Sequence, residues 1–200
     1  RSPASVVMIS LLLRSNSDNE SSSSSFLVAS AILLSSSLFL ISLASIYAAT
    51  GTVNMAQLAG RLAELDPSVQ LLLQVLLLVT FSIKAAVFPL SAWLPDSYPT
   101  APAPVTAVFA GLLTKVGVYA IIRTQTLLFP GQHLTNLLLV ASLLTMVIGI
   151  LGAVAQNEIK RMLSFTLVSH LGYMILGIAV ANQAGMAATI FYTAHHITIQ

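Results

Sequence analysis

Cysteine is absent from this 200-residue chain, and charged residues are scarce. Without cysteine the chain can form no disulfide bond and can offer no thiolate to haem or to an iron–sulfur cluster. Lysine, arginine, aspartate and glutamate make up only 7% of the residues, whereas a soluble domain carries roughly 25%. Hydrophobic residues make up 56%. This composition excludes an ordinary soluble enzyme, a nucleic-acid-binding protein and a disordered segment.

The sequence contains several long apolar runs. A helix that crosses a membrane needs about 20 mostly apolar residues. Five runs reach or approach this length, at residues 26–49, 69–94, 105–129, 137–155 and 163–181, and a sixth run begins near Ala184. The sequence therefore predicts an all-α fold, a polytopic transmembrane helix bundle formed by residues 26–200.

Residues 1–25 differ from the rest of the chain. An apolar stretch at 6–13 has the composition of a short remnant of a transmembrane helix, and residues 15–25 are rich in serine, which predicts a flexible polar loop. The chain begins at Arg1 and ends inside an apolar run, so we expect it to be a piece of a longer membrane protein. We identify no signal peptide.

Two lysines lie inside predicted spans. Lys84 is flanked by Phe81, Ile83 and Val87, and Lys115 lies midway along residues 105–129. A lysine that faces lipid near the bilayer centre costs about 2.5–3.5 kcal/mol, so such residues normally face a partner or a water-filled pathway for ions. Burial disfavours the charged form of lysine, which suits the group to proton transfer.

Histidines form a second set of candidate proton-relay groups. His170 lies in the fifth span, and His195 and His196 lie in the sixth. Tyr192 and His196 are four residues apart and share a helix face with Gln200, whereas His195 points about 100° away. A histidine that only packs and hydrogen-bonds is an almost equally good interpretation of His170. Adjacent histidines on a helix diverge and no cysteine or carboxylate lies nearby, so we predict no metal site and no other cofactor.

Five of the eight prolines fall between positions 89 and 104. Pro89 follows Lys84 by five residues inside the second predicted span. A proline there frees the carbonyl oxygen of Ala85 and kinks the helix. Broken transmembrane helices are typical of transporters, where exposed backbone helps to hold ions. We therefore predict a helix break at Pro89, beside a buried lysine.

Two segments resemble a known family. Residues 84–107, KAAVFPLSAWLPDSYPTAPAPVTA, and residues 111–119, GLLTKVGVY, resemble the antiporter-like, proton-translocating membrane subunits of respiratory complex I and of the Mrp-type sodium/proton antiporters. The similarity covers about residues 26–200 and is greatest to the D-type subunits of the Mrp branch. It implies an inverted-repeat fold of about fourteen transmembrane helices, of which this chain supplies a part.

The resemblance also implies roles for individual residues. Lys84 corresponds to the family's lysine on a broken helix, Lys115 to its central lysine, and His195 and His196 to its histidine region. In two places the chain departs from the family pattern. Residues 6–9 lack the glutamate that pairs with the first lysine in many members, and Gln200 stands where many relatives have lysine.

Three functions fit these observations. The first is a multi-pass subunit of a Na⁺/H⁺ antiporter in the bacterial plasma membrane, bound to other membrane subunits and conducting protons through buried lysine, histidine and water. The second is a proton-pumping subunit of an NADH:quinone oxidoreductase, which would be an enzyme subunit by membership. The third is a non-conducting assembly subunit or an inactive fragment. No nucleic-acid partner is expected.

Overall fold

The chain is a bundle of helices. The computed structural model describes residues 19–98, 103–130 and 134–199, and these contain helices and turns but no strand. The predicted all-α fold is confirmed. In chain order the elements are α2 (Asn19–Thr50), α3 (Met55–Ala63), α4 (Pro67–Ala85), α5 (Trp93–Ser97), α6 (Ala103–Val108), the π-helix η1 (Phe109–Leu113), α7 (Thr114–Arg123), the π-helix η2 (Thr124–Leu128), α8 (Thr135–Val154), α9 (Ile159–Ala179) and α10 (Gln183–Ile199).

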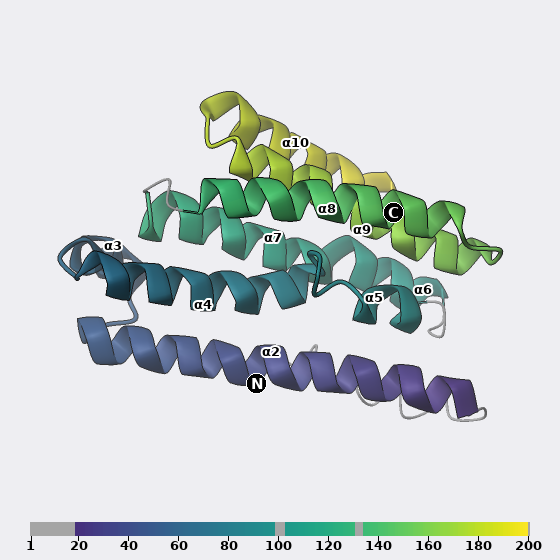
Figure 1. Cartoon of the computed structure of the whole chain (residues 1–200), viewed down its shortest axis with the longest axis horizontal. Helices are drawn as coiled ribbons and strands as arrows, with labels where there is room; N and C mark the ends of the chain where they lie inside the picture. Colours follow the sequence, from purple (N-terminus) through teal and green to yellow (C-terminus); the bar gives the residue numbers. More distant parts are fainter. Residues whose placement is uncertain (1–18, 99–102, 131–133, 200) are drawn as a thin grey trace.

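The long helices run roughly side by side (Figure 1). Within the described residues, five helices are long and apolar enough to cross a membrane: Ala29–Thr50, Pro67–Ala85, Thr106–Leu128, Thr135–Val154 and Ile159–Ala179. The five predicted spans are therefore confirmed, with one correction to the second. In Figure 1, α4 and α5 lie end to end between α2 and α7, so the second run is divided into two helices.

The serine-rich stretch is in part helical. Helix α2 begins at Asn19, so the loop predicted for residues 15–25 is wrong from that residue onward. The rest of this loop and the stretch at 6–13 lie outside the described residues. Serine is only slightly worse than average in helices, and an adjoining apolar helix of this length removes the cost of nucleation.

Helix α3 was not among the predicted elements. Asn54 caps it by accepting a hydrogen bond from the N–H of Ala56 at 3.1 Å. Leu58 and Leu62, one turn apart, are its buried residues. The guanidinium of Arg61 donates to the carbonyl of Thr50 at 2.5 Å and so satisfies the end of α2. This short helix turns the chain back toward α4.

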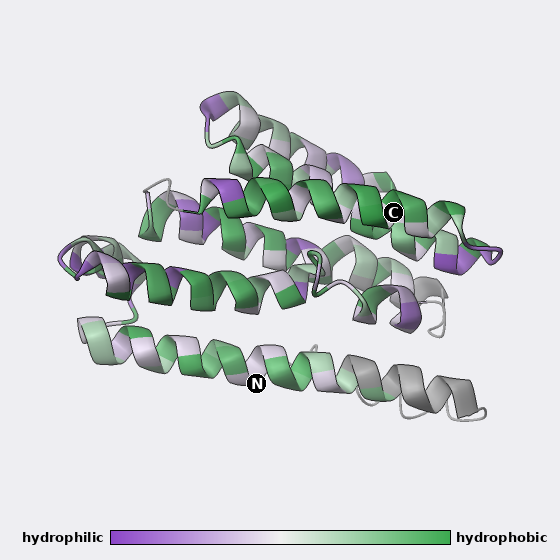
Figure 2. Ribbon diagram, in the orientation of Figure 1, coloured by the Kyte–Doolittle hydropathy of each residue, from purple (hydrophilic) through white to green (hydrophobic). Residues whose placement is uncertain are grey.

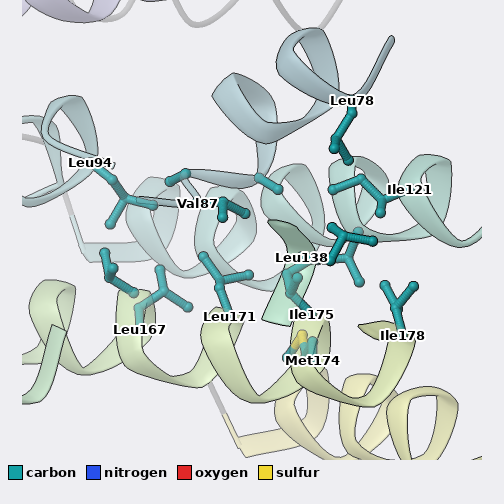
Figure 3. Close-up of a cluster of buried hydrophobic side chains, with 14 of the residues drawn as sticks. Leu78, Val87, Leu94, Ile121, Leu138, Leu167, Leu171, Met174, Ile175 and Ile178 are labelled. Atoms are coloured by element: carbon teal, nitrogen blue, oxygen red, sulfur yellow. The ribbon is translucent and has the colours of Figure 1, made fainter. Parts of the chain in front are cut away.

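The core lies between α4, α7 and α9. Leucine and isoleucine side chains of α9 point toward Leu78, Val87 and Leu94 in the close-up of the cluster (Figure 3). Outside this core the long helices remain apolar along most of their length, and hydrophilic colours gather near helix ends and turns (Figure 2). This distribution is what a bilayer requires, because its interior offers no water to polar side chains.

Small residues let the helices approach closely. A Cβ added to Gly117 would lie 2.8 Å from the backbone nitrogen of Ala85, so α7 and the end of α4 touch through backbone at this point. Between α8 and α9, a Cβ on Gly149 would lie 2.5 Å from the backbone nitrogen of Ser169. Such contacts favour helix association in membranes, where the hydrophobic effect does not drive it.

The contact at Gly117 gives a testable prediction. Gly117→Ala should destabilise the protein by about 1–3 kcal/mol, because the added methyl group overlaps backbone that has no room to move. Thermal unfolding of the purified full-length protein in detergent measures the effect. Gly60→Ala is the control, because nothing lies within 4 Å of its added Cβ. Equal midpoints for the two variants would contradict the close contact.

Candidate functional site

Lys84 lies in the last turn of α4 and is partly buried. The helix ends because Ala86 adopts a left-handed conformation with φ of 52°. The N–H of Ala86 bonds to the carbonyl of Ile83 at 3.3 Å, and the N–H of Val87 bonds to that of Ser82 at 3.0 Å. This pair of bonds is the Schellman termination, which usually has glycine at the left-handed position. A lysine at this place is favoured by the partial negative charge of the helix C-terminus.

Pro89 is not the residue at which helix α4 ends. Helix α4 has already ended at Ala85, and Pro89 is an exposed residue of the non-helical segment that leads to α5. The predicted break is present, but the left-handed turn at Ala86 makes it. The peptide bond between Phe88 and Pro89 is cis, and Pro89 has no N–H that could bond to the carbonyl of Ala85. The predicted break is thus present, and it begins three residues before Pro89, at Ala86.

The break lies halfway along the neighbouring helices. Ala85 touches Gly117, the middle residue of the Thr106–Leu128 span. Beyond the break, the N–H of Phe88 bonds to the hydroxyl of Thr145 at 3.0 Å, and Thr145 lies in the middle of α8. Lys84 is therefore at a helix end but remains in the middle of the bundle's depth, too far from either surface to place its ammonium group there.

Lys115 is 4% exposed and is the second residue after the π-helix η1. Its Nζ donates a hydrogen bond to the carbonyl oxygen of Ala110 at 2.6 Å. The hydroxyl of Thr114 donates to the same oxygen at 3.2 Å. The carbonyl of Ala110 belongs to the π turn η1, and π turns are common at functional sites. Lys115 thus has one backbone acceptor and, among the described residues, no carboxylate partner.

His170 lies next to the middle residue of α9 and meets α10 through Tyr192. The Nδ1 atom of His170 and the hydroxyl of Tyr192 form a short hydrogen bond. The ring of His196 packs edge-on against His170 with 4.8 Å between centroids. His196 is 5% exposed, and its Nδ1 has no hydrogen-bond partner among the described residues. Helix α9 packs against α7 and α10 packs against η1, so both histidines lie on helices that contact the segment around Lys115.

His195 lies at the edge of this cluster. It is exposed and stacks on Phe191 with 6.3 Å between ring centroids. The predicted divergence of His195 from His196 is therefore what the structure shows. Tyr173 packs against both His170 and Tyr192 and is a member of the cluster that sequence reasoning missed. The helical spacing of Tyr173 three residues after His170 was the available signal. Gln200 lies outside the described residues.

The structure brings some predicted residues together and keeps others apart. His170, His196 and Lys115 share one region, and Lys84 adjoins it through the contact of Ala85 with Gly117. In the described part of the chain, no hydrogen bond or ion pair joins any two of the predicted relay residues directly. The described residues also contain no group of three or more histidine, aspartate and glutamate side chains that could hold a metal ion.

The fold and these buried groups define a polytopic membrane protein with ionisable side chains at mid-depth, a feature of ion-translocating proteins. Residues 3–200 match the family described as NADH:quinone oxidoreductase/Mrp antiporter, transmembrane, and the chain belongs to this family. It is 47% identical over 170 residues to the D-type subunit of the Na⁺/H⁺ antiporter of Alkalihalophilus pseudofirmus, covering 83% of this chain and 34% of that protein. The chain thus spans about a third of the length of its curated relatives.

Solved structures show the same fold. One is the Mrp complex of a Dietzia species, with 39% sequence identity and a TM-score of 0.87, covering 95% of this chain and 36% of the matched chain. Another is the membrane-bound sulfane sulfur reductase, an archaeal respiratory membrane complex, with 32% identity and a TM-score of 0.89, covering 96% and 40%. The resemblance predicted from the motifs is confirmed, and it includes both branches of the family.

The bond between Tyr192 and His170 gives a second prediction. Tyr192→Phe removes the hydroxyl and keeps the ring, so the ¹⁵N resonances of the His170 ring should move when their hydrogen-bond partner is lost. Solid-state NMR of the histidine-labelled full-length protein in lipid measures this, with His170→Gln providing the assignment. The matched control is Tyr119→Phe, since Tyr119 is exposed on α7. Unchanged His170 resonances in Tyr192→Phe would contradict the bond.

Proposed function

We propose that this chain is the proton-conducting part of a membrane subunit of a multi-subunit monovalent cation/proton antiporter. Protons and Na⁺ are its substrates, other membrane subunits are its partners, and the bacterial plasma membrane is its location. Lys84, Lys115, His170 and His196 carry the proton, with His195 at the edge of the row. The similarity to the D-type subunit of a Na⁺/H⁺ antiporter and to a chain of an Mrp complex supports the choice of transported ions.

The observation that carries this proposal is the common depth of the buried ionisable groups. Lys84 adjoins the midpoint of the Thr106–Leu128 span, Lys115 lies two residues from that midpoint, and His170 lies one residue from the midpoint of α9. Groups at one depth, on helices that pack against each other, form a row parallel to the membrane plane. A proton that passes along such a row changes the charge beside the next group, which favours the next transfer.

The hydrogen-bonding state of His196 supports the same conclusion. A buried nitrogen without a partner costs about 1–3 kcal/mol, and its Nδ1 has none among the described residues. This cost is relieved if water reaches the ring from the side of α10. A histidine between Tyr192, His170 and such water has both a donor and an acceptor, as a relay group needs.

The family leaves a second candidate, a proton-pumping subunit of a respiratory complex. The likeness to the archaeal respiratory membrane complex favours it. Antiport needs no electron donor, whereas a respiratory pump does. Everted membrane vesicles that carry the full-length protein in its complex separate the two. Sodium added to a preformed pH gradient, without donor, should collapse the gradient, and a gradient that forms only when NADH is supplied would indicate the pump.

Replacing each of the two lysines inside the bundle tests the relay. We expect Lys84→Ala and Lys115→Ala each to abolish sodium-driven collapse of the gradient, because each removes a charge that the neighbouring groups respond to. The fluorescence of a pH indicator in the vesicles measures the rate, and immunoblotting measures the assembled protein. Lys160→Ala is the control, because Lys160 is exposed at the start of α9. Retained exchange in both lysine variants would exclude the relay, and a purely assembling subunit would lose complex formation instead.

A further inference from the structure

The break after α4 exposes a limited set of backbone donors. The N–H groups of Ala86 and Val87 are satisfied by the carbonyls of the last turn, and that of Leu90 bonds to the carbonyl of Val87 at 2.8 Å. Pro89 has no N–H. The N–H of Phe88 is therefore the one donor in residues 86–90 that no backbone carbonyl satisfies. An unpaired N–H in a membrane interior costs several kcal/mol.

Thr145 satisfies this donor from a different helix. Its side-chain oxygen accepts the N–H of Phe88 at 3.0 Å, and its own hydroxyl proton goes to the carbonyl of Ala141 at 2.5 Å. Because the proton is directed at Ala141, a lone pair of the oxygen is left to face Phe88. Thr145 is completely buried in the middle of α8. The bond joins positions 57 residues apart in the chain.

A second side chain fixes the other edge of the break. The indole N–H of Trp93 donates to the carbonyl of Ile83 at 3.0 Å, and both groups are buried. Lys84 lies between the two bonded backbone sites, one residue after Ile83 and four before Phe88. Its Cα is therefore held from both sides, although neither Trp93 nor Thr145 has a hydrogen bond to its ammonium group in the described structure.

We propose that Thr145 is a positioning residue for Lys84. It fixes the broken helix to α8 and so sets the place from which the lysine acts, without touching a transported ion. This inference rests on the proposed role of Lys84 in proton conduction. It makes α8, which carries none of the relay groups, necessary for their geometry.

Ser142 provides a matched control on the same helix. Like Thr145 it is completely buried, and it lies three residues away. Its hydroxyl donates to the carbonyl of Leu139 at 2.8 Å, within its own helix. If buried hydroxyls on α8 matter only for packing, Ser142→Ala and Thr145→Val should have comparable effects. If the bond to Phe88 matters, only the second change should impair transport.

The test uses the full-length protein in its complex, in everted vesicles, with rates normalised to the amount assembled. Thr145→Val keeps the shape and removes the acceptor, and we expect the maximal exchange rate to fall about five- to tenfold while the sodium concentration for half-maximal rate stays the same. Thr145→Ser restores the hydroxyl and should stay within about twofold of the original protein, as should Ser142→Ala.

Other results would overturn the proposal. They are a normal rate in Thr145→Val, an equal loss in Ser142→Ala, or no rescue by Thr145→Ser. If Thr145→Val fails to assemble, Thr145→Cys replaces it, since a thiol is a weaker acceptor, and a normal rate there has the same meaning. If the unsubstituted protein shows no sodium-driven exchange, the proposed function has failed, and the same variants are compared in donor-driven acidification. If the unsubstituted protein shows neither sodium-driven exchange nor donor-driven acidification, both proposals are overturned.

Discussion

A helix that stops halfway across a membrane must have every freed backbone group satisfied by protein, because the bilayer interior supplies no water. This constraint governs the centre of the bundle. The carbonyl of Ile83 is bonded by Trp93, and the N–H of Phe88 is bonded by Thr145. Both partners are buried and come from outside α4. The break that places Lys84 at a helix C-terminus in mid-membrane therefore depends on α8 to satisfy the N–H of Phe88, and α5 adds a second donor to the carbonyl of Ile83, which already accepts the N–H of Ala86.

Close packing of small residues connects the break to the neighbouring helices. Gly117 meets Ala85 beside the break, and Gly149 meets Ser169 where α8 crosses α9. Ser169 also donates a hydrogen bond to the carbonyl of Met146 at 3.1 Å, which fixes the relative height of these two helices. His170 is the next residue. The contacts that hold the backbone together thus also bring Lys84, Lys115 and His170 to one depth.

The parts of the structure that could be predicted from the sequence are those set by local pattern. Apolar runs of sufficient length located the spans, and the motif around residues 84–119 indicated the family. The left-handed Ala86 could not be predicted, because alanine rarely adopts this conformation and only tertiary contacts make it favourable. The same holds for the pairing of His170 with Tyr192, which lies on another helix. Helix α3 had a local signal in Asn54, Leu58 and Leu62, so missing it was avoidable.

The charged residues of the molecule lie in two kinds of environment, at the partly exposed helix ends and in the buried interior. Asp96 and Arg161 form an ion pair of 2.7 Å at the ends of α5 and α9, where both side chains are partly open to solvent. Such a pair contributes about 0–1 kcal/mol and suits a structural role at the surface. Lys115 is different, because its charge is buried with a backbone carbonyl as its hydrogen-bond partner. A carbonyl cannot take up the proton, so the ammonium group is stabilised without being neutralised. His170 and His196 lie on α9 and α10, which pack against α7 and η1 around this lysine, as the proposed proton conduction along the row requires.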